Sequence, residues 1–149
     1  MSEEKALTAI KDKFGGSLLD IFRKNDRRVY ITVDKNDIPA ICRYMYEDLG
    51  GRLAIATGLD SRSGIEILYH FMYPQDHQMI TVKTIVKKSS MEIESIATFF
   101  ASANWIEREM HDILGLNFTN HPDPRRILMA DDWPEGDYPF RRDFKERQQ

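Results

Sequence analysis

The feature that most restricts the fold is a nine-residue run with large apolar side chains at every second position. These positions are Ile65, Ile67, Tyr69, Phe71 and Tyr73. A period of two places alternate side chains on opposite sides of an extended chain. Residues 65–73 are therefore predicted to form a β-strand with one buried face.

Two neighbouring segments, residues 53–59 and 80–86, have the same period. The turn-forming sequences SRSG and YPQDHQ separate them from the central run. Because short turns join antiparallel strands, the three segments are predicted to pair in that way. An earlier apolar segment, RVYITV at residues 28–33, is predicted to be a further strand.

Four segments have the period or the end signals of helices. They are residues 6–14, 37–49, 92–100 and 102–114. Glycines follow three of the four segments, as is typical of helix C-termini. The predicted fold class is therefore α+β, with helices covering a mixed, largely antiparallel sheet.

Composition excludes several functions for this chain. Cys42 is the only cysteine, so the chain alone can form no internal disulfide and cannot supply the thiolates of an iron–sulfur cluster. A net charge of −3 argues against nucleic acid as the partner. No apolar run approaches the roughly 20 residues that a membrane span needs, so we expect no direct membrane insertion. One cysteine and a charged N-terminus favour an intracellular, reducing compartment.

The last 29 residues differ in character from the rest. They contain four prolines and no regular period, yet they keep large apolar side chains. These are Ile127, Leu128, Met129, Trp133, Tyr138, Phe140 and Phe144. A proline-rich segment with such anchors suits one that lies along a partner. We therefore predict a core domain at residues 1–118 and an extended, partner-binding C-terminal arm at residues 119–149.

A dense cluster of charges on the last predicted helix allows several interpretations. A helical projection places Trp105, Arg108, Glu109 and Asp112 on one side, and Glu107 and His111 on another. Glu107, His111 and His121 could surround a metal in a stand-alone enzyme, although no diagnostic ligand spacing is present. Glu109 and Asp112 could serve as an acid–base pair, or the charges could form an ion-pair network within the helix. Tryptophan and arginine together also favour a protein interface.

The C-terminal third resembles the C-type subunit of the NADH–quinone oxidoreductase family, which belongs to respiratory complex I. The first part of the family pattern is W-x-E-R-E-x-x-D-x-x-G-x-x-F, which begins here at Trp105 and ends at Phe118. H-P, R-R-I-L, an aromatic residue and P-x-R-x-D-F follow in order, ending at Phe144. The matching positions occur in the same order along a stretch of roughly forty residues, which is far more specific than a single short motif.

The DDWPEG-x-YP sequence and the short ending resemble the equivalent subunit of energy-converting membrane-bound NiFe hydrogenases more than the quinone-linked members. The resemblance implies a non-catalytic scaffold on the cytoplasmic peripheral arm of a membrane complex that couples electron transfer to ion translocation. The implied partners are a large, hydrogenase-like (D-type) subunit and an iron–sulfur small subunit. No cofactor is expected in this chain; iron–sulfur clusters, and NiFe in the hydrogenase branch, would belong to the partners.

We expect the partner interface to comprise residues of the helix and of the arm. They are Trp105, Glu107, Arg108, Glu109, Asp112, His121, Arg125, Arg126, Trp133, Arg141, Asp143 and Phe144.

Overall fold

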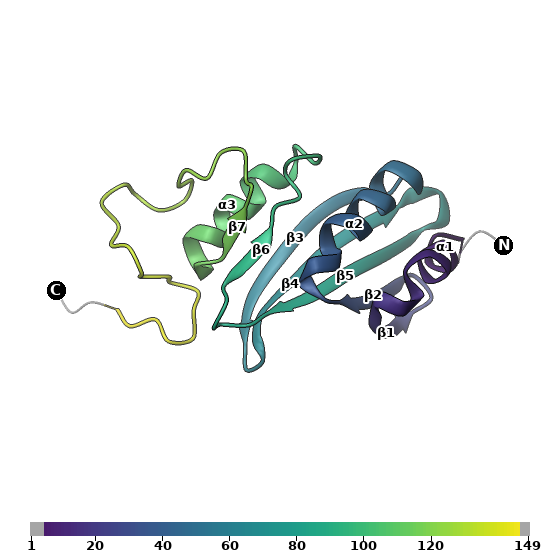
Figure 1. Cartoon of the computed structure of the whole chain (residues 1–149), viewed down its shortest axis with the longest axis horizontal. Coiled ribbons are helices and arrows are strands. Elements are labelled where there is room, and N and C mark those ends of the chain that lie inside the picture. Colours follow the sequence, from purple (N-terminus) through teal and green to yellow (C-terminus); the bar gives the residue numbers. More distant parts are fainter. Residues whose placement is uncertain (1–4, 147–149) are drawn as a thin grey trace.

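The computed structural model describes residues 5–146 of the 149-residue chain, and within that range it forms two sheets and three α-helices (Figure 1). The larger sheet has the order β1-β2-β5-β4-β3. Its strands are β1 (Leu18–Asn25), β2 (Arg28–Val33), β3 (Arg52–Ser61), β4 (Gly64–Tyr73) and β5 (Gln78–Val86). The smaller sheet pairs β6 (Glu92–Glu94) with β7 (Asn117–Thr119).

The helices are α1 (Lys5–Phe14), α2 (Ile38–Arg43) and α3 (Ala103–Leu114). A π-helical turn, η3 (Tyr44–Asp48), continues α2. Short 3-10 turns lie at η1 (Gly15–Ser17), η2 (Lys35–Asp37) and η4 (Pro74–Asp76). In the larger sheet β2 and β5 are parallel and the other pairs are antiparallel, so the predicted α+β class and mixed sheet are confirmed.

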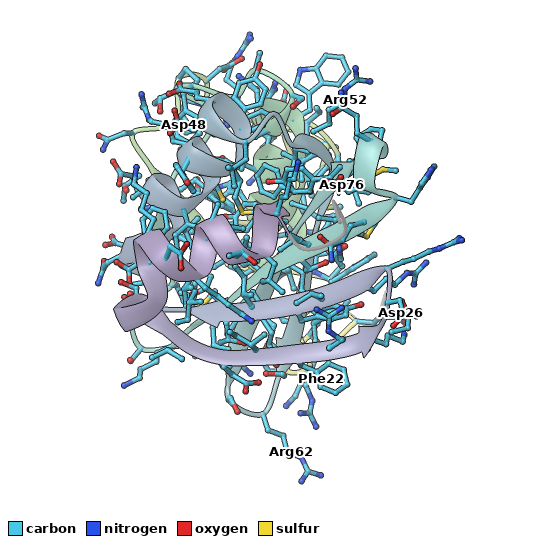
Figure 2. All side chains as sticks on the ribbon, turned by 90° about the vertical axis from the view of Figure 1, so that its right-hand side faces the viewer. Phe22, Asp26, Asp48, Arg52, Arg62 and Asp76 are labelled. Carbon is cyan, nitrogen blue, oxygen red and sulfur yellow. The ribbon has the colours of Figure 1, made fainter. Side chains whose placement is uncertain are left out.

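The alternating run forms β4 as predicted, and all five of its large apolar side chains are buried. The helices pack on this face of the sheet. The hydroxyl of Tyr73 donates to the Met45 carbonyl at the end of the α2 region, and Gly58 of β3 lies against Met110 and Leu114 of α3. Figure 2 shows the helices above the strands and Phe22 pointing to the opposite, open face.

Strand β1 was not predicted. Its sequence, LLDIFRKN, groups apolar residues in pairs instead of alternating them. It lies at the edge of the sheet and is exposed along almost its whole length, so it needs no buried face and has no period-two pattern.

The predicted helix at residues 92–100 is wrong. Residues 92–94 form β6 instead, and Ile93 pairs in parallel with Phe118 of β7. The Ile96 N–H donates to the side chain of Glu107, so this N–H group does not form the backbone hydrogen bond of a helix. Tertiary pairing has overridden a local pattern that suits a helix.

The structure does not show an arm that extends away from the core. Residues 120–146, here called the C-terminal segment, contain no helix or strand, but they fold back beside α3 (Figure 1). The physical reason is that side chains of α3 satisfy backbone groups of this segment, as described below. Residues 147–149 of the predicted arm lie outside the described residues.

Candidate partner-docking site

Helix α3 is the fixed element of the site. Met110 and Leu114 are buried against β3, where a side chain on Gly58 would come within 2.7 Å of the Leu114 Cδ1 atom. The helix ends at Gly115, which has a positive φ of 78°, as the sequence predicted for a glycine stop. This close packing fixes the position of α3. One of its other sides then contacts the β6 region, and another contacts the C-terminal segment.

Glu107 is buried, with an exposed fraction of 1%, although the sequence placed it in a partner interface. Its Oε1 accepts hydrogen bonds from the Ile96 N–H at 2.9 Å and from the Ser95 hydroxyl at 3.2 Å. Its Oε2 is also buried and has no hydrogen-bond partner within residues 5–146. Burial outweighs the bonds from residues 95–97 and raises the pKa of Glu107 from 4.5 to about 7. Glu107 therefore joins α3 to the β6 region inside this chain.

Asp112 holds residues 127–129 of the C-terminal segment. Its Oδ2 accepts three consecutive backbone N–H groups, from Ile127, Leu128 and Met129, at 2.8–3.1 Å. Burial alone would raise the pKa of Asp112. These three bonds and the nearby His111 outweigh that effect and hold the pKa below its ordinary value of 3.8. The carboxylate thus acts as an anchor for a stretch of backbone that has no regular structure.

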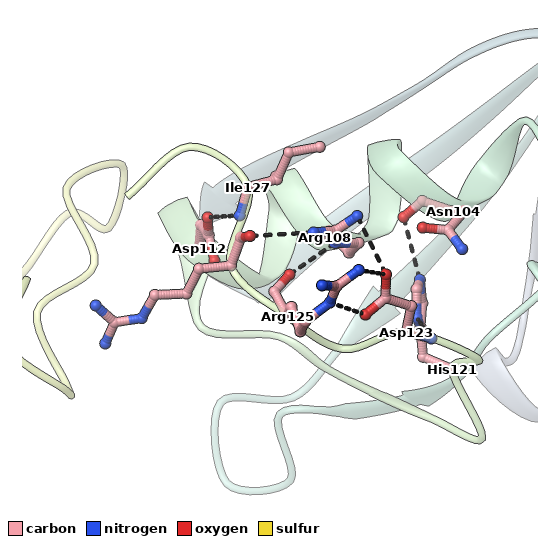
Figure 3. Close-up of polar contacts among 8 residues, drawn as sticks. Asn104, Arg108, Asp112, His121, Asp123, Arg125 and Ile127 are labelled. Atoms are coloured by element: carbon pink, nitrogen blue, oxygen red, sulfur yellow. Dashed lines mark hydrogen bonds and ion pairs between the residues drawn. The ribbon is translucent and has the colours of Figure 1, made fainter. Parts of the chain in front are cut away.

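Arg108 complements Asp112 by binding carbonyl groups of the same stretch (Figure 3). Its Nε donates to the Arg125 carbonyl at 2.7 Å and its Nη2 to the Arg126 carbonyl at 3.0 Å. Asp123 lies 3.6 Å from Arg108 and accepts a bidentate pair from Arg125 at 2.7 and 2.8 Å. The Arg125 hydrogen bonds, with Arg108 nearby, lower the pKa of Asp123 to about 2.

Farther along the C-terminal segment, Arg126 and Trp133 stabilise a loop. The Arg126 Nη1 donates to the carbonyls of Ala130 and Trp133, both at 2.7 Å. The Trp133 indole N–H donates to the Asp137 carbonyl at 2.7 Å, and its ring stacks on Phe144 with centroids 6.4 Å apart. Backbone groups that lack a regular partner are thus satisfied by side chains of the segment.

The end of the segment is attached to α3 and β3. The Phe140 N–H donates to the Ile113 carbonyl at 3.0 Å, and the Arg142 N–H donates to Asp60 at 2.8 Å. Arg141 reaches the Leu114 carbonyl at 3.5 Å and pairs with Asp143 at 3.3 Å. A hollow of about 550 Å³ remains between α3 and the segment, and Asp112, Arg126, Trp133 and Tyr138 line part of it.

Three predicted metal ligands, Glu107, His111 and His121, line one small hollow of about 30 Å³. However, polar atoms of all three side chains form hydrogen bonds with other groups of the chain. The His121 Nε2 donates to the Asn104 carbonyl and its Nδ1 accepts from the Asp123 N–H, while the His111 Nδ1 donates to the Leu116 carbonyl. Within residues 5–146 no group of three or more histidine, cysteine or acidic side chains is arranged to hold a metal ion.

The outward surface of α3 and the C-terminal segment, here called the docking surface, exposes three large apolar side chains. Trp105 is 69% exposed, Phe140 66% and Leu128 52%. Three predicted interface residues, Glu109, Arg125 and Asp143, are also exposed on the same elements. Leu128 and Phe140 are among the apolar anchors noted in the sequence, but they are not among the predicted interface residues. The sequence feature that could have placed them in the interface is their position in a proline-rich stretch.

Substituting Gly115 with alanine is expected to displace part of the C-terminal segment. A Cβ atom there would lie 2.5 Å from the Tyr138 ring, and the positive φ adds strain. We expect a loss of about 2–3 kcal/mol in the free energy of unfolding, measured by urea denaturation.

Gly136 provides a matched control because its φ is also positive, at 86°, and a Cβ atom there would contact nothing within 4 Å. Gly136→Ala should cost only about 1 kcal/mol, from backbone strain alone. Equal losses in the two variants would show that the contact with Tyr138 does not hold the segment.

The fold and this site define a class of small α+β domain in which a C-terminal helix carries an attached segment rich in arginine and aromatic residues. The family model described as "Respiratory-chain NADH dehydrogenase, 30 Kd subunit" matches residues 31–149. The chain therefore belongs to this family, which is that of the C-type subunit of complex I, and the resemblance noted in the sequence is confirmed.

Individual relatives come from both branches of that family. The chain is 34% identical to the C-type subunit of the NADH-quinone oxidoreductase of Geobacter sulfurreducens, over 94% of this chain and 88% of the relative. It is 35% identical to hydrogenase-4 component G of Escherichia coli, over 94% of this chain but only 26% of that longer protein. These two sequence identities are so similar that they do not show to which branch the chain belongs.

Solved structures confirm the fold. A chain of the membrane-bound sulfane sulfur reductase, described as an archaeal respiratory membrane complex, superposes with a TM-score of 0.81 at 23% identity. The match covers 97% of this chain and 86% of that one. Among residues 5–146, none of the helices is both long and apolar enough to traverse a bilayer.

Proposed function

We propose that this chain is a non-catalytic scaffold subunit of a membrane-attached, complex I-like oxidoreductase. It docks on the large hydrogenase-like subunit, beside the iron–sulfur small subunit, on the cytoplasmic peripheral arm. There it supports electron transfer that is coupled to ion translocation. Support comes from the family assignment and from relatives named as subunits of a quinone oxidoreductase and of a hydrogenase. Because both branches match at similar identity, the proposal covers both.

The redox centres are assigned to partner subunits. Cys42 is the only thiol in the sequence, and its side chain is completely buried. Burial and the nearby Glu107 raise the pKa of this thiol well above its usual range, so it remains protonated. Iron–sulfur clusters, and NiFe in a hydrogenase, therefore need ligands from other chains.

The observation that carries the proposal is the exposure of Trp105, Leu128 and Phe140 on a backbone that is already fixed. A partner that covers these side chains gains apolar burial without first having to order the segment. The buried members of the predicted interface have a different role in this proposal. Arg108 and Asp112 position the docking surface from beneath, and Glu107 fixes α3 to the core.

Removing either of two arginines that brace the segment is expected to weaken assembly while the core still folds. Arg126→Ala removes the donor to the carbonyls of Ala130 and Trp133, and Arg141→Ala removes the contact with the Leu114 carbonyl. We expect a loss of about 2–5 kcal/mol in association with the large subunit, because carbonyl groups of the segment lose a charged donor and the segment must then be ordered again on binding. Affinity purification of the tagged chain, with quantification of the large subunit, measures the effect.

Arg43→Ala is a suitable control. Arg43 is on α2, away from the docking surface, where it forms an exposed pair with Glu47 and lies over the Phe99 ring. That variant should retain the large subunit at the wild-type level. Normal recovery of the large subunit with both Arg126→Ala and Arg141→Ala would contradict the proposed docking mode, provided that circular dichroism shows folded protein.

A further inference from the structure

A second surface lies at the end of the large sheet that is far from the C-terminal segment. There the β1–β2 and β4–β5 turns, marked by Asp26 and Asp76, face the viewer in Figure 2. Between them is a groove of about 420 Å³, here called the arginine groove. Its lining includes Arg27, Arg28, Met72, His77, Gln78 and Met79.

The charges of the arginine groove have one sign. No acidic side chain lines it, and neither Arg27 nor Arg28 has a side-chain ion-pair partner within residues 5–146. The strand register places a further arginine on the open face of the sheet. Arg28 is followed by Met79, then Met72, then Arg52 on successive strands. Asp26 and Asp76 lie in the flanking turns, but the lining of the groove carries only positive charge, which is complementary to an acidic ligand.

The same groove also offers apolar contacts. Met72 is 43% exposed and is the cross-strand neighbour of Met79, so two flexible thioether side chains form an adaptable apolar floor. Gln78 pairs in register with Tyr73, whose side chain is on the helix-covered face, so its buried amide does not contribute to binding in the groove.

We propose that the arginine groove binds an extended acidic segment of a second partner protein. Carboxylates of that segment pair with Arg27 and Arg28, and an apolar side chain rests on Met72 and Met79. This interaction goes beyond the proposed function, because it lies at the opposite end of the molecule from the docking surface (Figure 1). The chain then bridges two proteins.

Photo-crosslinking in the assembled complex tests this inference. The probe is p-benzoylphenylalanine in place of Met72, in the full chain expressed with its partners and illuminated before purification. We expect a crosslink to a segment of another protein that carries several aspartates or glutamates beside the crosslinked residue. The same probe in place of Leu59, which is 40% exposed at the other end of the open face, is the positional control.

Charge reversal adds a second measurement. Arg28→Glu is expected to lower the crosslink yield at position 72 about tenfold, whereas Arg62→Glu, in the β3–β4 turn, should leave it unchanged. The large subunit should still co-purify with Arg28→Glu. The two proposals can thus fail independently. Failure of the docking proposal is seen in co-purification of the large subunit, and failure of this one is seen in the crosslink yield at position 72.

Three results would overturn the inference. The first is a yield at position 72 no higher than at position 59, and the second is a crosslink to a segment without acidic residues. The third concerns an anionic membrane surface, which would also attract arginines. If the full chain sediments with phosphatidylglycerol vesicles and Arg28→Glu abolishes this binding, the ligand is a lipid surface and not a protein segment.

Discussion

Replacing Glu107 with glutamine is expected to abolish a fall of about 3 kcal/mol in the free energy of unfolding that the wild-type protein shows between pH 5 and pH 8. Glu107 is almost completely buried, and one of its carboxylate oxygens has no hydrogen-bond partner in the described residues. Its surroundings include the Tyr69 hydroxyl and the Cys42 thiol, both of which are buried and uncharged. Ionising the carboxyl group there is therefore unfavourable.

The direction of the pH effect follows from the raised pKa. Below pH 4.5 the carboxyl group is protonated in both the folded and unfolded states, so the full stability is present. As pH rises from 4.5 to about 7, the unfolded chain releases its proton first, and stability falls. Above that range both states are ionised and the loss is complete. Glutamine has no proton to lose, so the variant should lack this slope.

Urea denaturation at intervals between pH 5 and pH 8 measures the effect. Glu109→Gln is the matched control, because Glu109 is on the same helix and exposed, and it should retain the wild-type slope. All ionisable groups other than the substituted one are common to the proteins that are compared, so their contributions cancel. A pH dependence that is the same for wild type and Glu107→Gln would contradict the assignment of a buried, high-pKa carboxyl group.

The second large effect is expected from Asp112→Ala. Without the carboxylate, the N–H groups of residues 127–129 lose their acceptor. Three charge-assisted hydrogen bonds are lost together, which we expect to destabilise the closed C-terminal segment by about 3 kcal/mol. The open population should rise about a hundredfold, and trypsin should cleave after Arg125 and Arg126 correspondingly faster.

Asp112→Asn should have a smaller effect, because an amide oxygen still accepts N–H groups, although without charge. Glu109→Ala, three residues earlier on an exposed position, should leave the rate of cleavage unchanged. Equal protection of the segment in wild type and Asp112→Ala would mean that other contacts, such as that of Phe140 with Ile113, are sufficient to hold it.

The elements with a repeated pattern were predictable from the sequence. The alternation in β4 and β5 and the glycine that ends α3 each reflect a local constraint, and the structure has them as expected. Strand β1 was missed because an exposed edge strand needs no alternation. Residues 92–100 are assigned to a helix by their local pattern because β6 pairs with residues that are 25 positions distant in the sequence, and such pairing leaves no local signal.

The residues of the candidate site were identified by their family pattern, but their orientation was not predictable from a helical projection. The projection separates the sides of α3 and cannot say what covers each side. The sheet covers one side, the β6 region covers Glu107, and the C-terminal segment covers Asp112. For this reason two carboxylates that were expected to face a partner are 1% and 5% exposed and bind backbone groups of their own chain.

The most direct test of the docking proposal is the dissociation constant between the purified chain and the large subunit, measured by titration calorimetry. The informative variant is Trp105→Ala, because this 69% exposed side chain has little role in folding. Phe22→Ala, which removes a 57% exposed aromatic side chain from the open face of the sheet, is the control. We predict that Trp105→Ala weakens binding by about 2 kcal/mol, close to thirtyfold, while Phe22→Ala binds like wild type. Unchanged binding by Trp105→Ala, or an equal loss with Phe22→Ala, would contradict docking through α3 and the C-terminal segment.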